Sequence, residues 1–214
     1  MKNKKLFLSF VAAAALLLIS FAYKPLSLSE STAVKHLRAK IKSTILPGAP
    51  THTVEVSDLM TLENIAGAKS KDKAYEKKYH PDEIKIKNEK VKEGDLVTIK
   101  ECWIHLVGSE SDNDYHIQIS GSKSNTTACL IIEIPPKSSD KKLSAQFKVL
   151  RKKLEKYHTD KLLPQPLHAT VTGQFFFDDD HVEKENAGGR RGKDGMKATN
   201  LWEVHPVTDL TMLN

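Results

Sequence analysis

Apolar and polar residues alternate in short runs along the second half of the chain, which is typical of β-strands with one buried face. Turn residues such as Gly, Ser, Asn and Asp separate most of these runs. The pattern predicts five strands, at residues 95–110, 114–122, 128–136, 168–178 and 200–210. Between the third and fourth strands the apolar spacing lengthens to three and four residues. It predicts a helix over residues 144–158, with an apolar face made of Phe147, Leu150, Leu154 and Tyr157.

The order of these elements indicates the fold. Three strands, a helix and two further strands follow one another in the OB-fold barrel. A three-layer α/β fold would need helices between most of its strands. We therefore predict a mainly β protein, a five-stranded OB-like barrel at residues 95–214 with one helix between strands three and four.

The start of the chain has the layout of an export signal. Three lysines precede an apolar run from Leu6 to Tyr23. The run is near the lower limit for crossing a bilayer and lacks an A-x-A cleavage site, so residues 1–23 are either a cleaved signal peptide or a membrane anchor. We expect an exported protein that is periplasmic, secreted, or held at the membrane by this segment and facing outside the cytoplasm.

The segments between the signal and the barrel have weaker patterns. Residues 24–50 end in "ILPGAP", which breaks regular structure, and we expect a tether there. Residues 51–94 contain one short strand or helix and a Lys-rich connection. They are expected to be an N-terminal extension of the domain without a functional role.

Strand alternation also predicts a polar surface outside the barrel. In an OB barrel the third strand lies between the second and the fifth, and these strands contribute to the ligand-binding face. Their outward positions give the predicted ligand-binding residues His116, Gln118, Glu133, Glu203 and His205. The common alternative is a set of solvated polar residues.

Imidazoles and carboxylates together suit zinc, manganese or iron, and they also suit acid/base chemistry. "DDDH" at residues 178–181 adds further oxygen and nitrogen ligands at the start of the loop between strands four and five, although such a run is often only a solvated turn. The predicted metal set is therefore His116, Glu133, Asp178, His181, Glu203 and His205. Asp178 is expected at the opposite end of its strand from His116 and Glu133, so the two clusters need not meet. A divalent metal ion is the one cofactor that these residues suggest.

The same alternation places Phe176 outside the barrel among polar residues. It puts Cys102 inside and Cys129 outside, which disfavours a disulfide between them. A bulge in the first strand would reset this phase, so the pairing stays open.

Four short motifs resemble a family of uncharacterised exported bacterial proteins. They are "DNDYHI", "IEIP", "VTGQFFFDDDH" and "WEVHPVTDL", and the resemblance covers roughly residues 54–210. It implies a site made of the matching residues Asp112, Asp114, His116, Glu133, Asp178, His181, Glu203 and His205. It implies no reaction, and the chain departs from the pattern after His181, where it reads "HVEKE".

Composition weakens the case for a nucleic-acid partner but does not identify the function. The net charge is +6, but most lysines alternate with acids and only four residues are arginine, the side chain best suited to grip phosphate. Nucleic acid is therefore a weakly supported partner. Arg190 and Arg191 are the only candidates for phosphoryl chemistry, and their Gly-rich loop is typical of a solvated turn.

Three functions remain. The first is an exported binding module for a small ligand, a glycan or a protein. The second is a metal-dependent hydrolase, such as a nuclease, that uses the His/Glu patch. The third is a structural envelope protein.

Overall fold

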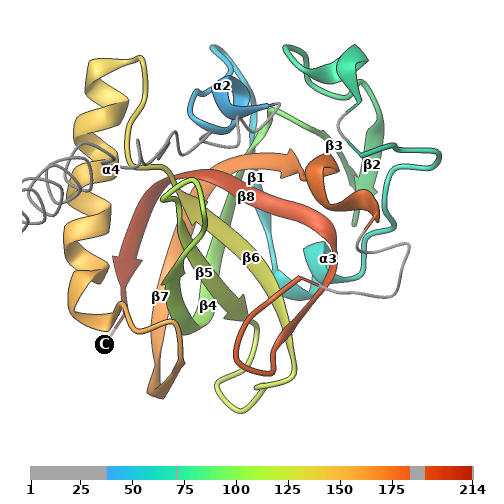
Figure 1. Cartoon of the computed structure of the whole chain (residues 1–214). Helices are drawn as coiled ribbons and strands as arrows, with labels where there is room; N and C mark the ends of the chain where they lie inside the picture. Colours follow the sequence, from blue (N-terminus) through green and yellow to red (C-terminus); the bar gives the residue numbers. More distant parts are fainter. Residues whose placement is uncertain (1–37, 71, 184–190, 214) are drawn as a thin grey trace, which may run out of the picture. The chain divides into compact units, whose positions relative to one another are not determined.

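The computed structural model describes residues 38–70, 72–183 and 191–213, so the predicted signal or anchor segment lies outside the described residues (Figure 1). Among the described residues, no helix combines the length and the apolar character needed to cross a membrane.

Five strands close into a barrel. They are β4 (Leu96–Ser109), β5 (Tyr115–Ser120), β6 (Ala128–Ile134), β7 (Leu162–Phe177) and β8 (Lys197–Met212). The hydrogen-bonded order is β4-β5-β6-β8-β7, and β7 pairs back with β4. Only the β6–β8 pair of the barrel is parallel. The predicted OB-like barrel, with one helix between its third and fourth strands, is confirmed.

That helix is α4 (Lys141–Leu154), which packs against β8 and β6. It begins before the predicted residue 144 because the Asp140 carboxylate caps it, accepting hydrogen bonds from Lys142 N at 2.7 Å and Leu143 N at 3.1 Å. Its last predicted residues form a separate 3₁₀ turn, η2 (Glu155–Tyr157). Of the predicted apolar face, Phe147, Leu150 and Leu154 are buried and Tyr157 is partly buried; Leu143, which precedes the predicted helix, is buried as well.

The barrel core consists of the inward-facing apolar residues of the strands. Phe175 and Phe177 point into this core, whereas Phe176 is buried outside it, as the alternation predicted. β7 and β8 lie so close together at Gly173 that an added Cβ would be only 2.5 Å from Val204 Cγ1. The register of the two strands shifts on both sides of Gly173.

The two cysteines are free and buried on opposite sides of the barrel wall. Cys102 belongs to the barrel core, and Cys129 belongs to a separate outer cluster with Ile131, Met196 and Ala198. A bulge does lie between Ile99 and Cys102, but it leaves Cys102 facing inward. The argument from alternation against a disulfide is therefore confirmed.

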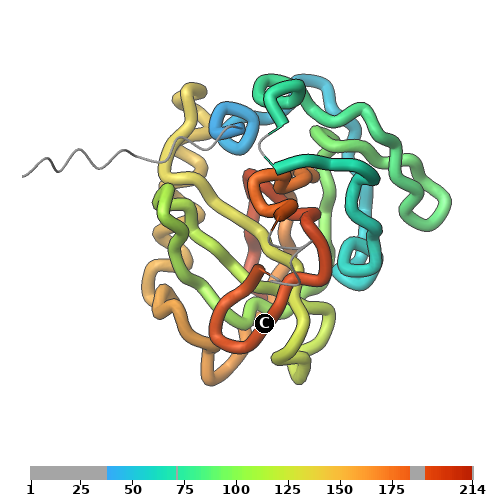
Figure 2. Tube along the Cα trace, turned by 45° about the vertical axis from the view of Figure 1, so that its right-hand side comes forward, coloured from blue at the N-terminus to red at the C-terminus, as the bar shows by residue number. Residues whose placement is uncertain are grey.

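The chain before the barrel adds five short elements and a 3₁₀ turn. These are α2 (Ala39–Lys42), β1 (Thr51–Val54), α3 (Val56–Met60), η1 (Lys73–Tyr75), β2 (Glu83–Ile86) and β3 (Glu89–Lys92). β1 pairs in parallel with β4, and β2 and β3 form a separate hairpin. Figure 2 shows α2 beside the connection from β6 to α4. Arg38 and Ile41 are buried, so from Arg38 onward the segment predicted as a tether belongs to the folded unit.

Candidate metal centre on the outer face of the barrel

The five predicted ligand-binding residues share one surface, and that surface is buried rather than solvated. His116 on β5 pairs directly with Glu133 on β6, and Glu203 on β8 lies opposite Ile131 of β6 and Phe176 of β7. All five side chains belong to residues no more than 5% exposed. The outward-facing side chains on this face of the barrel are therefore covered by other segments of the chain.

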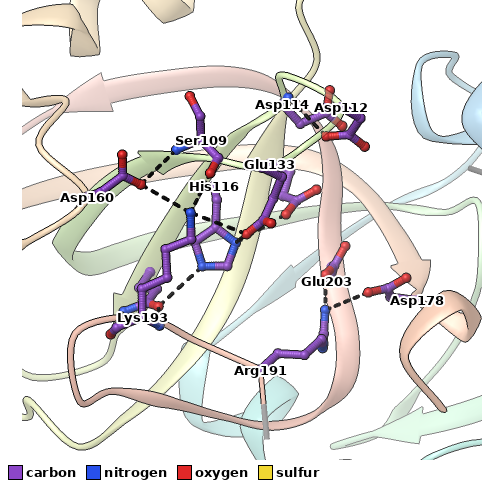
Figure 3. A network of polar contacts seen from close by, with 12 residues as sticks. Ser109, Asp112, Asp114, His116, Glu133, Asp160, Asp178, Arg191, Lys193 and Glu203 are labelled. Atoms are coloured by element: carbon purple, nitrogen blue, oxygen red, sulfur yellow. Dashed lines mark hydrogen bonds and ion pairs between the residues drawn. The ribbon is translucent and has the colours of Figure 1, made fainter. Parts of the chain in front are cut away.

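Three segments cover this face. The first contains α2, from which the Arg38 guanidinium lies 4.7 Å and the Lys42 ammonium 5.6 Å from the centre of the Phe176 ring. The second is the turn between β4 and β5, which carries Glu110 and Asp114. The third is the segment that leads into β8, which carries Arg191 and Lys193. Figure 3 shows that the acidic and basic side chains of the two later segments converge on β5, β6 and β8.

Glu133 lies between the two predicted imidazoles. Its Oε1 is 3.3 Å from His116 Nδ1, and its Oε2 is 3.1 Å from His205 Nδ1. His116 Nδ1 is also 3.0 Å from Glu110 Oε1, and His205 Nε2 is 3.1 Å from Asp114 Oδ2. We call Glu110, Asp114, His116, Glu133 and His205 the histidine region.

The carboxylates control the charges of this region. Burial acts to lower the pKa of His116, but hydrogen bonds and attraction from Glu110 and Glu133 raise it to about 9. The pKa of His205 is likewise raised well above its usual value, against burial, by Asp114, Glu133 and Glu203. Burial acts to raise the pKa of Glu133, yet the two imidazoles and Lys42 hold it well below its usual range. These imidazoles and Glu133 therefore hold each other in their charged forms.

A different set of contacts neutralises the remaining carboxylates of the face. Arg191 Nη1 donates to Asp178 Oδ2 at 2.9 Å and also contacts Glu203 Oε1, while its Nη2 donates to the Asn200 carbonyl at 2.8 Å. Arg191 thus contacts one residue of each predicted cluster, Asp178 and Glu203. The sequence had left open whether the two clusters meet. It is buried and ion-paired, so the interpretation of its loop as a solvated turn is wrong for Arg191.

A second guanidinium, that of Arg38, lies 3.8 Å from Oδ1 of the neighbouring Asp179. Arg38 binds Glu93 in a bidentate ion pair, with nitrogen–oxygen distances of 2.8 and 2.7 Å, and donates to the Phe177 carbonyl at 2.8 Å. Glu93 in turn accepts from the backbone amide of Phe177 at 2.8 Å. We call Arg38, Glu93, Asp178, Arg191 and Glu203 the arginine region.

Three basic side chains surround Asp178. The Lys42 ammonium is 3.7 Å from Asp178 Oδ1, and both Arg191 and His181 Nδ1 contact Oδ2. Burial acts to raise the pKa of Asp178, but Lys42, His181 and Arg191 hold it well below its usual range. Both Asp178 and Asp179 are buried, so the "DDDH" run is not the solvated turn that was its alternative interpretation.

Within the described residues, two groups of three side chains converge closely enough to hold a metal ion: Glu110, His116 and Glu133, and Asp114, Glu133 and His205. Of the predicted metal set, His116, Glu133 and His205 lie in these groups. Glu203 Oε2 lies beside them, 3.4 Å from His205 Nδ1. Asp178 and His181 belong to neither group.

The spacing of these atoms fits metal ligands. Two atoms bound to zinc at 2.0–2.1 Å with tetrahedral angles lie about 3.3 Å apart. The nitrogen–oxygen distances in the histidine region run from 3.0 to 3.3 Å. His205 is buried, with Nε2 3.1 Å from Asp114 Oδ2 and Nδ1 3.1 Å from Glu133 Oε2.

A groove open to solvent reaches one of the candidate ligands. A surface groove of about 520 Å³ runs between α2 and the β6–α4 connection, and Lys42, Asp112 and Asp114 line it. Asp114 is thus both a member of the convergent group and part of the groove wall.

Sequence reasoning missed several residues of this face. Asp114 followed only from the family resemblance, and Glu110, Arg38, Lys42 and Glu93 were not predicted at all. Glu93 lies in the extension where no function was expected, and its carboxylate is buried against Arg38. The scarcity of arginine was the one available signal, because a rare arginine in a Lys-rich chain is a candidate for a buried ion pair.

Comparisons with protein-family models, curated proteins and solved structures found no match for this chain. The family resemblance therefore stays a prediction, and the class of protein rests on the fold and the site: an OB-like barrel with a buried histidine–carboxylate centre on its outer face.

Proposed function

We propose that the protein is an exported OB-like binding module that binds a divalent metal ion through Asp114, Glu133 and His205. The observation that carries the proposal is the convergence of these three buried side chains, whose ligand atoms all lie within 4.8 Å of one another.

The surroundings of His205 support a ligand role. Its Nδ1 lies 3.4 Å from Glu203 Oε2, within hydrogen-bond geometry. Each ring nitrogen faces a carboxylate, Nδ1 toward Glu133 and Glu203 and Nε2 toward Asp114, so an ion can replace the proton of one nitrogen while the other keeps its proton. Histidine ligands in metal sites usually donate their other N–H to a carboxylate in this way, which fixes the ring and its tautomer.

The ligand types restrict the ion. One imidazole and two carboxylates suit a borderline or hard first-row cation such as Zn²⁺ or Mn²⁺. Three protein ligands leave a coordination position for water or for a second ligand. A small ligand, a glycan or a side chain of a protein partner would reach the ion through the groove that Lys42, Asp112 and Asp114 line.

Phosphoryl chemistry has weaker support from the same face. Arg191, the described candidate for stabilising a phosphoryl transition state, is held by Asp178 and Glu203. Each described arginine (Arg38, Arg151 and Arg191) donates to a protein carbonyl or carboxylate. The metal-dependent hydrolase therefore ranks below the binding module, and a nucleic-acid partner has no guanidinium donor here to support it.

The proposed export and membrane attachment rest on the sequence of residues 1–23 alone. A fusion of residues 1–50 to a reporter that is active only outside the cytoplasm tests this part. An inactive reporter in a cell that expresses the fusion stably would contradict it.

Calorimetric titration with Zn²⁺ and with Mn²⁺ tests the metal proposal. We expect saturable binding by the wild type and loss of the ion held by this group, seen as a lower stoichiometry or as no binding, in His205→Ala and Asp114→Asn. His168→Ala is the matched control, because His168 stacks on Trp103 away from the histidine region. Absence of binding in the wild type, or unchanged binding in both site variants, would refute the proposal.

A further inference from the structure

We infer that the histidine region binds a second divalent ion, through Glu110, His116 and Glu133, and that the Glu133 carboxylate bridges the two ions. This inference rests on the proposed function and extends it from one ion to a two-metal centre.

The first support is the convergence of atoms on His116. Its Nδ1 is 3.0 Å from Glu110 Oε1 and 3.3 Å from Glu133 Oε1. One N–H bond is directed at one acceptor, so a proton on Nδ1 satisfies one of these oxygens well. A metal ion at this place would be shared by the nitrogen and both oxygens.

The second support is the tautomer that Gln118 imposes on His116. The backbone amide of Lys193, which can only donate, contacts Gln118 Oε1, and Gln118 Nε2 donates to the Lys193 carbonyl at 3.1 Å. These two contacts fix which end of the Gln118 amide is oxygen. That oxygen lies 3.2 Å from His116 Nε2 and can only accept from it.

Since Nε2 keeps its proton on Gln118, an ion that displaces the other ring proton would bind Nδ1, which is the atom that faces Glu110 and Glu133. Orientation of a ligand histidine through its other nitrogen is the usual outer-shell arrangement of metal sites. Gln118, predicted from the sequence as a ligand-binding residue, is thus a positioning residue for His116.

The third support is the orientation of Glu133. Its two oxygens face different imidazoles, Oε1 toward His116 and Oε2 toward His205. A carboxylate with one oxygen on each ion is a natural bridge, and ions in two-metal sites lie about 3.5–4 Å apart. Glu110, Asp114 and Glu133 supply the carboxylates of the two groups, and Glu133 is the one that both groups share.

The Lys193 ammonium competes with the second ion for the Glu110 carboxylate. The ammonium lies 3.5 Å from Glu110 Oε1 and 3.1 Å from Asp160 Oδ1. The second contact gives Lys193 a partner outside the site when an ion binds Glu110. We therefore expect Lys193→Gln to tighten binding of the second ion, whereas Gln118→Leu should weaken it by about 10–100-fold.

A second ion would also favour the alternative function, the metal-dependent hydrolase. Two ions can stabilise both the attacking and the leaving oxygen of a displacement. They would supply the positive charge that Arg191, bound to Asp178 and Glu203, does not present.

The test is the Mn²⁺ stoichiometry of the full-length protein, measured by equilibrium dialysis and elemental analysis, together with electron paramagnetic resonance of the bound ions. We expect two ions per chain with a spin-coupled signal in the wild type and in His168→Ala. His116→Ala and His205→Ala should each retain one uncoupled ion, and Glu133→Gln should lose the coupled pair. His116→Gln replaces His116→Ala if circular dichroism shows that the alanine variant is unfolded.

The outcomes separate the two proposals. One ion in the wild type, lost in His205→Ala but kept in His116→Ala, would refute the second site and leave the proposed function standing. Two ions without spin coupling, both retained in Glu133→Gln, would refute the bridge. No bound ion in the wild type would overturn both proposals.

Discussion

The histidine region and the arginine region both bury carboxylates on the outer face of the barrel, but they neutralise them with different cations. In the histidine region, imidazoles face Glu133 and Asp114 at 3.1–3.3 Å. In the arginine region, guanidiniums bind Glu93 and Asp178 through hydrogen bonds of 2.7–2.9 Å. The two regions adjoin at Glu203, which contacts both His205 and Arg191.

The difference determines what each region can do. A guanidinium keeps its proton at any ordinary pH and has no lone pair to offer a metal. Its carboxylate partners are fixed in permanent ion pairs. An imidazole can release its proton and become a ligand, so its carboxylate partners can exchange a proton for an ion. The arginine region is therefore suited to holding the covering segments in place, and the histidine region to binding.

The largest expected effect is in the arginine region. Arg38→Met would leave Glu93 buried without its bidentate partner, and breaking such a pair costs about 3–5 kcal/mol of unfolding free energy. Urea unfolding measures this loss. Lys152→Ala is the control, because it removes an exposed ion pair with Glu155 and should change stability far less. Equal stability of the two variants would show that Arg38 does not hold the covering segment.

The next effect separates the regions by metal. An ion at 100 times its dissociation constant stabilises the folded state by about 2.7 kcal/mol. We expect Mn²⁺ to raise the unfolding free energy of the wild type by about this amount for each ion relative to a chelator, and to raise that of His205→Ala by less. Arg191→Met should be less stable but still gain from the ion. Loss of the gain in Arg191→Met would mean that the two regions do not act independently.

The fold followed from the sequence because strand alternation is a local property. It brought His116, Glu133 and His205 together correctly, since strand pairing relates these positions directly. It could not show that the face is covered, because burial outside the barrel depends on contacts between distant segments. Arg38 binds the carbonyl of Phe177, which is 139 positions away. Glu110 and Asp114 flank a turn, where alternation predicts no side-chain direction.

A smaller effect should appear in acid. Since the folded-state pKa of Asp178 is depressed, Asp178 contributes stability that is present above its unfolded pKa of about 3.8. That contribution is lost as the pH falls from there through the folded-state pKa, at about 1.4 kcal/mol for each unit of depression. Unfolding free energies of the wild type and Asp178→Asn, measured from pH 6 downward, should converge in acid. Parallel curves would contradict the depressed pKa.

The smallest expected effect concerns His181, whose side chain is of the kind found in the histidine region but whose partner belongs to the arginine region. His181 is an imidazole in contact with the arginine region, where its Nδ1 meets Asp178 Oδ2. If any buried imidazole–carboxylate pair on this face bound metal, His181→Gln would lower the Mn²⁺ stoichiometry. We expect it to be unchanged, because Lys42 and Arg191 already neutralise Asp178 and, among the described residues, no third ligand converges there. The His181 side chain is 27% exposed, so its replacement should also cost no more than about 1 kcal/mol in urea unfolding. A lost ion in His181→Gln would move the metal centre toward Asp178 and end the division between the two regions.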